Sequence, residues 1–216
     1  MCTSFDSIID VENIIKAFQK AVNISLIKSS KGIPSKQKHI RPTDEVLIIH
    51  KVGDEYCLDI MRWGFKLQTG PMVNSRLEEI TAGKNAEYWQ SLLDANPCLF
   101  VMSGYNEWKS AEIDMFTPKG KPTKKKVKQP FKFTIKNKET FFCAGYFRKE
   151  GIDNACTLIT TVGNDVTRLV HEKNRMPVIL EIDAGIKFLN GTLEEKIALC
   201  QSYPSDNMDS TPTTLL

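Results

Sequence analysis

The stretch Glu45–Phe65 reads EVLIIHKVGDEYCLDIMRWGF, and its pattern decides the kind of fold that we expect. Apolar side chains dominate both Glu45–Lys51 and Glu55–Phe65, and many of them are β-branched or aromatic, as in β-strands. The residues between these segments, Val52–Asp54, include a glycine, which adopts the backbone angles of tight turns at little steric cost. The stretch therefore predicts a β-hairpin.

The same reasoning extends outward along the chain. Asp10 before an apolar periodic segment predicts the start of a first helix, and Thr192-x-x-Glu195 is the capping box of a last one. Further strands are predicted over 97–104, 131–135, 140–147 (paired with 131–135 as a hairpin), 156–162 and 176–181. Helices are predicted over 10–22, 86–95, about 164–170, from Asp183 to Gly191, and after Thr192. Hairpins with inserted helices and no βαβ alternation predict an α+β domain built on antiparallel sheet.

The composition is that of one globular domain over residues 1–216. Apolar residues make up 41% of the chain and charged residues 25%, which are ordinary values for a chain that buries a full core. No segment approaches the ~18 apolar residues of a membrane span, and Asp6 near the start argues against a secretory signal. We expect a cytoplasmic monomer with no membrane partner, whose tail from about Ser202 is loosely ordered.

Six cysteines lie far apart, and no two of them form a C-x-x-C pair. This spacing argues against a zinc site and a disulfide framework, and it favours reduced thiols in a cytosol. We therefore expect no metal and no cofactor. Cys98, Cys143 and Cys156 lie inside apolar runs and are predicted to be buried.

Met1-Cys2 carries the strongest chemical signal. Removal of Met1, expected before a small second residue, would leave Cys2 with an α-amine and a thiol on adjacent carbons. Both groups titrate near enough to neutral pH, at about 7.7–8.0 and about 8.5, to be partly in their reactive forms. Such an aminothiol condenses with an aldehyde to an imine and closes to a thiazolidine, or it acts as a thiol nucleophile with its own amine as base. Taken alone, Cys2 is better explained as the residue that happens to follow the start codon, so the chemical interpretation needs support from elsewhere in the chain.

Two other features are ambiguous when each is taken by itself. Glu107 lies between Tyr105 and Trp108 at the end of a predicted buried strand. This position suits either a proton donor with a raised pKa or a salt-bridged glutamate at a turn. Residues 117–130 are rich in lysine, with proline and glycine, and predict a loop. The lysines suit either a solvated tip or a phosphate backbone.

A set of short motifs follows in a fixed order over residues 1–180. The motifs are Met1-Cys2, Arg41-Pro42-Thr43, Met61-Arg62-Trp63-Gly64, Asn74-Ser75-Arg76, Ser103-Gly104-Tyr105-Asn106-Glu107-Trp108, Lys128-Gln129-Pro130-Phe131, Ile159-Thr160-Thr161, and His171 followed by Arg175-Met176-Pro177-Val178-Ile179-Leu180. With this ordered set the chain resembles the SOS response-associated peptidase (SRAP) family, which includes the bacterial and human proteins that shield abasic sites.

The resemblance implies a barrel-like antiparallel core and a sensor of abasic sites in single-stranded DNA. Cys2 would become linked to the ring-opened deoxyribose aldehyde as a thiazolidine. Asn74 would orient the amine of Cys2 and the sugar through hydrogen bonds. Glu107 would act as general acid/base, and His171 would contact the opened sugar or exchange protons during imine formation.

Five further side chains match family positions that bind the substrate. Thr160 would line the same pocket, and Arg76 would bind phosphate. Trp63 would wedge against bases beside the lesion. Arg62 and Arg175 would be additional phosphate contacts.

These residues also have purely structural interpretations. Trp63 and Trp108 suit core aromatic residues, and for Trp108 we favour the core over contact with DNA. His171 suits a helix C-cap, and Asn74 suits a turn.

Three functions are therefore compared. The first is a covalent crosslinker of abasic single-stranded DNA, bound at the nucleoid and in contact with the replication machinery. The second is an N-terminal-nucleophile cysteine peptidase or amidohydrolase using Cys2 with Glu107 and His171, whose simplest reaction removes the residue before Cys2. The third is a non-catalytic single-strand binder using Lys119–Lys132 and Trp63. We rank them in this order, and repeated turnover would distinguish the second from the first.

Overall fold

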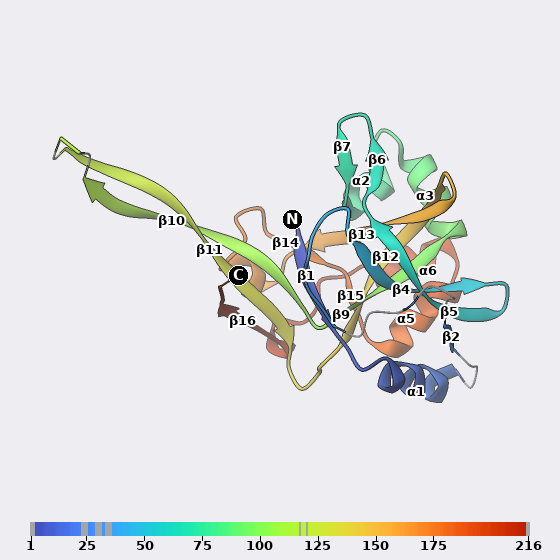
Figure 1. Ribbon diagram of the computed structural model, residues 1–216. Helices are drawn as coiled ribbons and strands as arrows, with labels where there is room; N and C mark the ends of the chain where they lie inside the picture. The colour runs from blue at the N-terminus through green and yellow to red at the C-terminus, as the bar shows by residue number, and fades with distance from the viewer. Residues whose placement is uncertain are drawn as a thin grey trace.

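The computed structural model describes residues 3–22, 26–28, 32, 36–116, 118–119 and 121–214 (Figure 1). Met1 and Cys2, on which the predicted chemistry depends, lie outside the described residues. The fold is α+β with mostly antiparallel sheets, as predicted. Within the described part of the chain, no helix is long and apolar enough to cross a membrane.

The predicted hairpin is confirmed and lies in the largest sheet. Strands β4 (Glu45–Val52) and β5 (Glu55–Trp63) pair in antiparallel register, and Gly53 turns between them with φ of 61°. The sheet runs in the order β14-β13-β12-β9-β4-β5-β2. A parallel pairing of β5 with β13 closes β5-β4-β9-β12-β13 into a ring, so the core is barrel-like, as expected. Its other strands are β2 (Leu26–Lys28), β8 (Asn74–Arg76), β9 (Pro97–Met102), β12 (Phe141–Glu150), β13 (Asp153–Val162), β14 (Arg175–Pro177) and β15 (Ile179–Leu180).

A second sheet contains the first and the last strand of the described chain, with β10 and β11 between them. Its order is β16-β11-β10-β1-β3. These strands are β1 (Ser4–Ile8), β3 (Lys36–Ile40), β10 (Gly104–Phe116), β11 (Pro122–Ile135) and β16 (Met208–Pro212). A small third sheet pairs β6 (Phe65–Leu67) with β7 (Gly70–Met72).

Most helices begin where the sequence predicts. Asp10 Oδ1 accepts hydrogen bonds from the backbone of Glu12 and Asn13 and so caps α1, and the Thr192–Glu195 capping box is formed. Glu181, rather than Asp183, is the N-cap residue of α5. The helices are α1 (Val11–Val22), α2 (Leu77–Ala82), α3 (Ala86–Ala95), α4 (Asp165–Arg168), α5 (Ile182–Asn190), α6 (Leu193–Leu199) and the 3₁₀ turn η1 (Ser205–Asn207).

The strands of the large sheet bury both of their faces, because different layers cover each one. One apolar cluster joins the sheet to the helices, for example through Phe18 of α1 and Phe188 of α5. The other joins it to the second sheet, where the ring of Phe5 on β1 packs edge-on against Trp63 and Phe100. Cys98, Cys143 and Cys156 are buried among these strands, as predicted.

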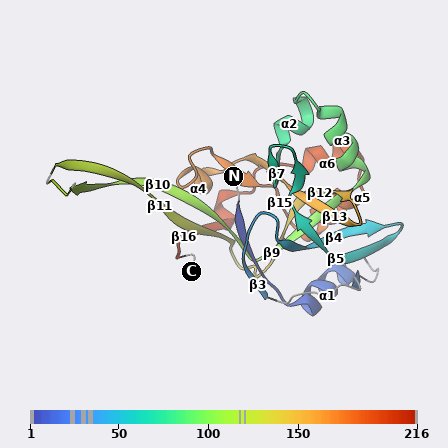
Figure 2. The same ribbon diagram turned by 45° about the horizontal axis from the view of Figure 1, so that its top comes forward.

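The predicted loop over 117–130 is wrong for residues 122–130, which belong to strand β11, whereas residues 118–119 do form a turn and residues 117 and 120 lie outside the described residues. Strands β10 and β11 pair from Tyr105↔Phe133 out to Phe116↔Pro122 and form a long ribbon that projects from the body (Figures 1 and 2). The lysine-rich stretch lacks apolar residues for a core, and this absence was the basis of the loop prediction. A two-stranded ribbon needs no such core, because its backbone groups bond to one another while its side chains remain in water.

Two further predictions fail because they concern contacts between distant segments. Segments 131–135 and 140–147 are strands, but they do not form a hairpin, because β11 pairs with β10 and β16 while β12 joins the large sheet. The tail after Ser202 is not loosely ordered, because β16 pairs with β11 from Met208 to Pro212. The strand that orders the tail, β11, lies more than seventy residues earlier in the sequence, so the local composition of the tail did not reveal the pairing.

Candidate functional site

Glu107 lies where the second sheet meets the body. The pairing Ser4↔Asn106 holds the start of β1 against β10, and Glu107 is the next residue of β10. Its side chain is only 2% exposed. Burial disfavours the charged carboxylate and raises the pKa of Glu107 to about 7. Glu107 therefore lies within a strand and not at the turn of the salt-bridge interpretation, and its raised pKa is the property that a proton donor requires.

His171 is presented by a short helix and a tight turn. The Asn164 side chain caps α4 by accepting a hydrogen bond from Thr167 N, and the backbone N–H of His171 donates to Thr167 O over 2.8 Å. Asn174 closes the turn with φ of 46°, and its N–H donates to His171 O. The helix is shorter than predicted, but His171 does follow its end.

Glu107 and His171 form a pair. His171 Nε2 lies 3.6 Å from Glu107 Oε2, and both side chains are buried. Burial lowers the pKa of His171, in the opposite direction from its effect on Glu107. A carboxyl group that is partly protonated near pH 7 beside a neutral imidazole can give and take protons at neutral pH.

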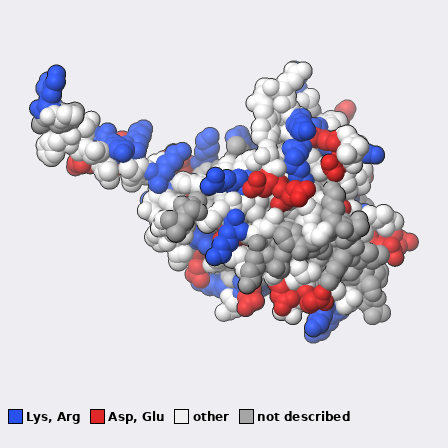
Figure 3. All heavy atoms as spheres, viewed as in Figure 1, with Lys and Arg blue, Asp and Glu red and all other residues white. Residues whose placement is uncertain are grey.

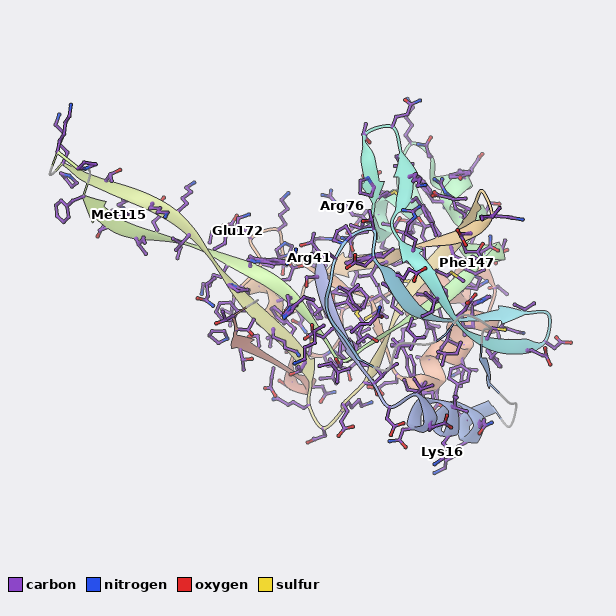
Figure 4. All side chains as sticks on the ribbon, in the orientation of Figure 1. Lys16, Arg41, Arg76, Met115, Phe147 and Glu172 are labelled. Carbon is purple, nitrogen blue, oxygen red and sulfur yellow. The ribbon has the colours of Figure 1, made fainter. Side chains whose placement is uncertain are left out.

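The pair opens into a pocket of about 310 Å³ between β10, the start of β1 and the His171 turn. Thr3 is part of its wall, and the residue covalently bonded to Thr3 on its N-terminal side is Cys2. Figure 4 labels Glu172 where the ribbon leaves the body. The pocket is lined by Thr3, Glu107, Trp108, Ser110, Lys128, His171, Glu172 and Lys173.

Arg175 supports His171 from behind instead of facing solvent. Its backbone N–H lies 3.2 Å from His171 Nδ1, and its carbonyl oxygen lies 3.1 Å from the same nitrogen. The guanidinium donates to Thr160 O and Oγ1 over 2.7 and 3.2 Å and to Glu78 Oε1 over 2.6 Å. Because the side chain is buried and engaged in these bonds, it does not have the exposure that the predicted phosphate contact requires. Thr160 is fully buried as well, and its hydroxyl binds Arg175.

Asn74 and Arg76 lie side by side on β8 with different exposures. The strand pairs in parallel with β13, so that Asn74 is opposite Leu158 and Arg76 is opposite Thr160. Asn74 is buried, and it is not one of the residues lining the pocket of Glu107 and His171. Arg76 is exposed, as contact with a phosphate requires (labelled in Figure 4).

Trp63 and Arg62 are occupied by structural contacts. Trp63 has no exposed surface, and its Nε1 donates to Val73 O over 2.8 Å. It belongs to the core and is not available to wedge against a base in this conformation. The guanidinium of Arg62 forms an ion pair with Glu150 and donates to Gly64 O. Both residues therefore hold the end of β5 in place.

Sequence reasoning missed the role of Trp108. It was expected in the core, but it is half-buried and lines the pocket next to Glu107. Strand alternation gives no signal for this role, because Gly104–Glu107 are buried in succession and Trp108 is the first partly exposed residue of β10. Lys128 and Lys173 were also not predicted as pocket residues, and they add positive charge to its wall.

The cysteines and histidines do not gather into a metal site in the described ranges. No group of three or more His, Cys, Asp or Glu side chains there could hold a metal ion. His50 lies 3.6 Å from Asp59 on the neighbouring strand, far from Glu107 in the fold.

Comparisons with known proteins agree with this fold. An abasic site processing protein of Saccharomyces cerevisiae is 28% identical over 164 residues, and the match covers 70% of this chain but 39% of that protein. A phage-related protein from Bordetella bronchiseptica superposes with a TM-score of 0.76 at 18% identity, covering 99% of this chain and 95% of the other. A protein from Bacteroides thetaiotaomicron gives 0.75 at 17% identity, with coverages of 99% and 92%.

The two structural matches show the fold alone, because their sequence identity is low. The family model described as "SOS response associated peptidase (SRAP)" matches residues 1–214, nearly the whole chain. The chain therefore belongs to the SRAP family.

Proposed function

We propose that this protein senses abasic sites in single-stranded DNA and becomes covalently attached to them through Cys2 after loss of Met1. The observation that carries the proposal is the pocket in which Glu107 and His171 face one another and whose wall includes Thr3. Cys2 is bonded to Thr3, and consecutive Cα atoms are about 3.8 Å apart, which is why the proposal assigns its amine and thiol to this pocket. The yeast relative's name, an abasic site processing protein, supports the same substrate.

The proposed reaction joins the aminothiol to the ring-opened sugar aldehyde. The amine adds to the aldehyde carbon, and loss of the resulting hydroxyl as water gives an imine. The thiol sulfur then adds to the imine carbon while its proton passes to the nitrogen, which closes the thiazolidine. The net change is loss of one water, and no oxidant or reductant is consumed.

Glu107 is suited to the dehydration step. Burial raises its pKa to about 7, so a large fraction is protonated at neutral pH and can protonate the departing hydroxyl. His171, 3.6 Å away, can then return a proton to the carboxylate or take one from the thiol. Lys128 and Lys173 on the pocket wall suit the phosphates flanking the sugar.

The mass of the intact protein tests the proposal. The mature chain should lack Met1, and incubation with an abasic single-stranded oligonucleotide should add the mass of the oligonucleotide less one water. Cys2→Ala should abolish the heat-stable adduct, because neither a thiazolidine nor a thiol adduct can form. Cys57→Ser is the matched control, since Cys57 is the one half-buried thiol among the cysteines that the structure describes. An adduct that persists in Cys2→Ala would rule out the linkage.

A cysteine peptidase is the second candidate, and the family's description favours it. Cys2, Glu107 and His171 could also support acyl transfer from the same pocket. The two functions differ in turnover. A hydrolase releases product repeatedly, whereas a crosslinker stops at one equivalent of DNA per protein.

A further inference from the structure

The outer part of the β10–β11 hairpin, residues 108–130, is called the arm here. It leaves the body at the pocket and carries paired residues from Trp108↔Pro130 to Phe116↔Pro122 (Figures 1 and 2). Most of its side chains are exposed on both faces, with Met115 far out along it (Figure 4). A two-stranded ribbon of this kind buries little apolar area and adds little to the stability of the fold. Its side chains are thus available to a partner.

The charge of the arm identifies the kind of partner. Residues 108–130 contain seven lysines and two acidic residues, a net charge of +5, while the whole chain carries +3. The rest of the protein is therefore slightly negative. Figure 3 shows basic atoms along the arm and at its tip, whereas acidic groups are interspersed with basic ones on the body. A polyanion is attracted to the arm rather than to the protein as a whole.

The lysines of β11 form a row that starts at the pocket. Residues paired directly across two antiparallel strands share a face, and so do alternate residues of one strand, so Lys124, Lys126 and Lys128 lie on one face of the arm. Their partners across the ribbon, Asp114, Glu112 and Ser110, share that face, so the lysines exceed the acidic residues there by one. Lys128 lines the pocket of Glu107. Lys124 Nζ lies 3.5 Å from Glu112, while Lys126 and Lys128 have no ion-pair partner among the residues that the structure describes. Successive members of the row are about 7 Å apart along the strand.

The two strands of the arm between its base and its tip, residues 109–115 and 121–129, have side chains that suit phosphates better than bases. Neither 109–115 nor 121–129 contains an aromatic residue or an arginine. Single-stranded nucleic acid is usually held by stacking bases on aromatic side chains, and bases are read by forked donors such as arginine. Lysine acts as a point charge toward phosphate and needs no particular base. The dense phosphates of a double helix, one charge per about 1.7 Å of axis, match this composition.

We propose that the arm binds the phosphate backbone of a DNA duplex flanking the pocket, without regard to sequence or lesion. The inference rests on the proposed function in one respect, since it takes the pocket as the place where the abasic strand enters. From Trp108 to Phe116 the arm extends about 27 Å at about 3.4 Å per residue, enough to follow roughly eight base pairs. The arm would hold the duplex next to the single-stranded segment that reaches Glu107.

The test uses undamaged DNA, so its outcome does not depend on adduct formation. Binding of the full-length protein to a fluorescent 20-base-pair duplex and to a 20-nucleotide single strand is measured from about 50 to 200 mM KCl. The variant Lys124→Gln/Lys126→Gln/Lys128→Gln should bind the duplex more weakly, and its slope of log affinity against log salt should be smaller by up to about 2.7. Binding of the single strand should change less.

The matched control removes the same charge from the far side of the body. Lys16, Lys20 and Lys187 are exposed on α1 and α5 (Lys16 is labelled in Figure 4), and their replacement by glutamine should leave the duplex slope at the wild-type value. Equal slopes in the arm and control variants would overturn the proposal, as would a loss confined to the single strand. A change only in self-association, measured by sedimentation, would instead assign the arm to a second copy of the chain. If the wild-type protein bound the duplex as expected but formed no Cys2 adduct with an abasic oligonucleotide, the proposed function would be refuted and the arm assignment would stand.

Discussion

The inner and outer halves of the β10–β11 hairpin share one backbone ladder but lie in opposite environments. In the inner half, Tyr105 stacks on Phe133 at 4.8 Å and both are fully buried, next to the buried Glu107. In the outer half, Ile113 and Met115 are 44% and 40% exposed among lysines. Backbone pairing is therefore compatible with both environments. What differs is whether other segments cover the ribbon, and in the covered half burial raises the pKa of Glu107.

Removing the acid from the covered half should have the largest effect. Glu107→Gln keeps the shape of the side chain but removes its proton chemistry, so formation of the Cys2 adduct should slow by about 10²-fold or more. Single-turnover gels with an abasic oligonucleotide measure this rate. Glu139→Gln, at an exposed position between β11 and β12, is the control and should keep the wild-type rate. A Glu107→Gln rate within a few-fold of wild type would show that the acid has no part in the reaction.

Truncating one apolar side chain in each half should affect the free energy of unfolding very differently. Phe133→Ala removes a fully buried ring and should lower the free energy of unfolding by about 3–5 kcal/mol. Val127→Ala, six residues before it on the same strand in the arm, should change it by no more than about 0.5 kcal/mol. Urea unfolding of both variants measures the difference. Similar losses would mean that the arm is packed against something in solution.

The buried carboxyl group of the covered half should also make the free energy of unfolding depend on pH. The pKa of Glu107 is raised from 4.5 to about 7 in the folded protein, so between these values the folded state binds the proton that the unfolded state has lost. Stability should therefore fall as pH rises from about 4.5 to 7, by about 3 kcal/mol at most. The lowered pKa of His171 acts in the opposite sense, because stability is lost when the pH falls through its ordinary value of 6.5.

Urea titrations at several pH values in wild type and Glu107→Gln isolate the contribution of the carboxyl group. The falling limb should disappear in the variant, leaving the dependence that His171 contributes. A variant with the same falling limb as wild type would show that Glu107 titrates near its ordinary value.

Much of the fold could be predicted because it depends on local patterns. The helix α3 occupies the predicted residues, and the hairpin β4–β5 turns at Gly53, since apolar periodicity, caps and a turn glycine act over a few residues. The pairing of β16 with β11 and the closure of β5 on β13 could not be predicted in the same way. They join segments distant in sequence, and no local pattern specifies which strand is the partner.

The candidate site divides along the same line. The ordered motifs identify Glu107 and His171 as members of one set, and the structure brings them to 3.6 Å. The same motifs identify Trp63 and Arg175, which the structure buries in the core and behind His171. Motif membership thus does not distinguish a residue that lines the pocket from one that supports a neighbour.

By itself the sequence determined the α+β class, the family resemblance and the chemical potential of an N-terminal cysteine, because these depend on residue identity and short-range order. Only the tertiary structure decided that Glu107 is buried beside His171, that Trp63 is fully buried in the core, and that the lysine-rich segment is an extended arm. Burial, pKa and exposure depend on which distant side chains exclude water from a group. That information arises only when the chain is folded.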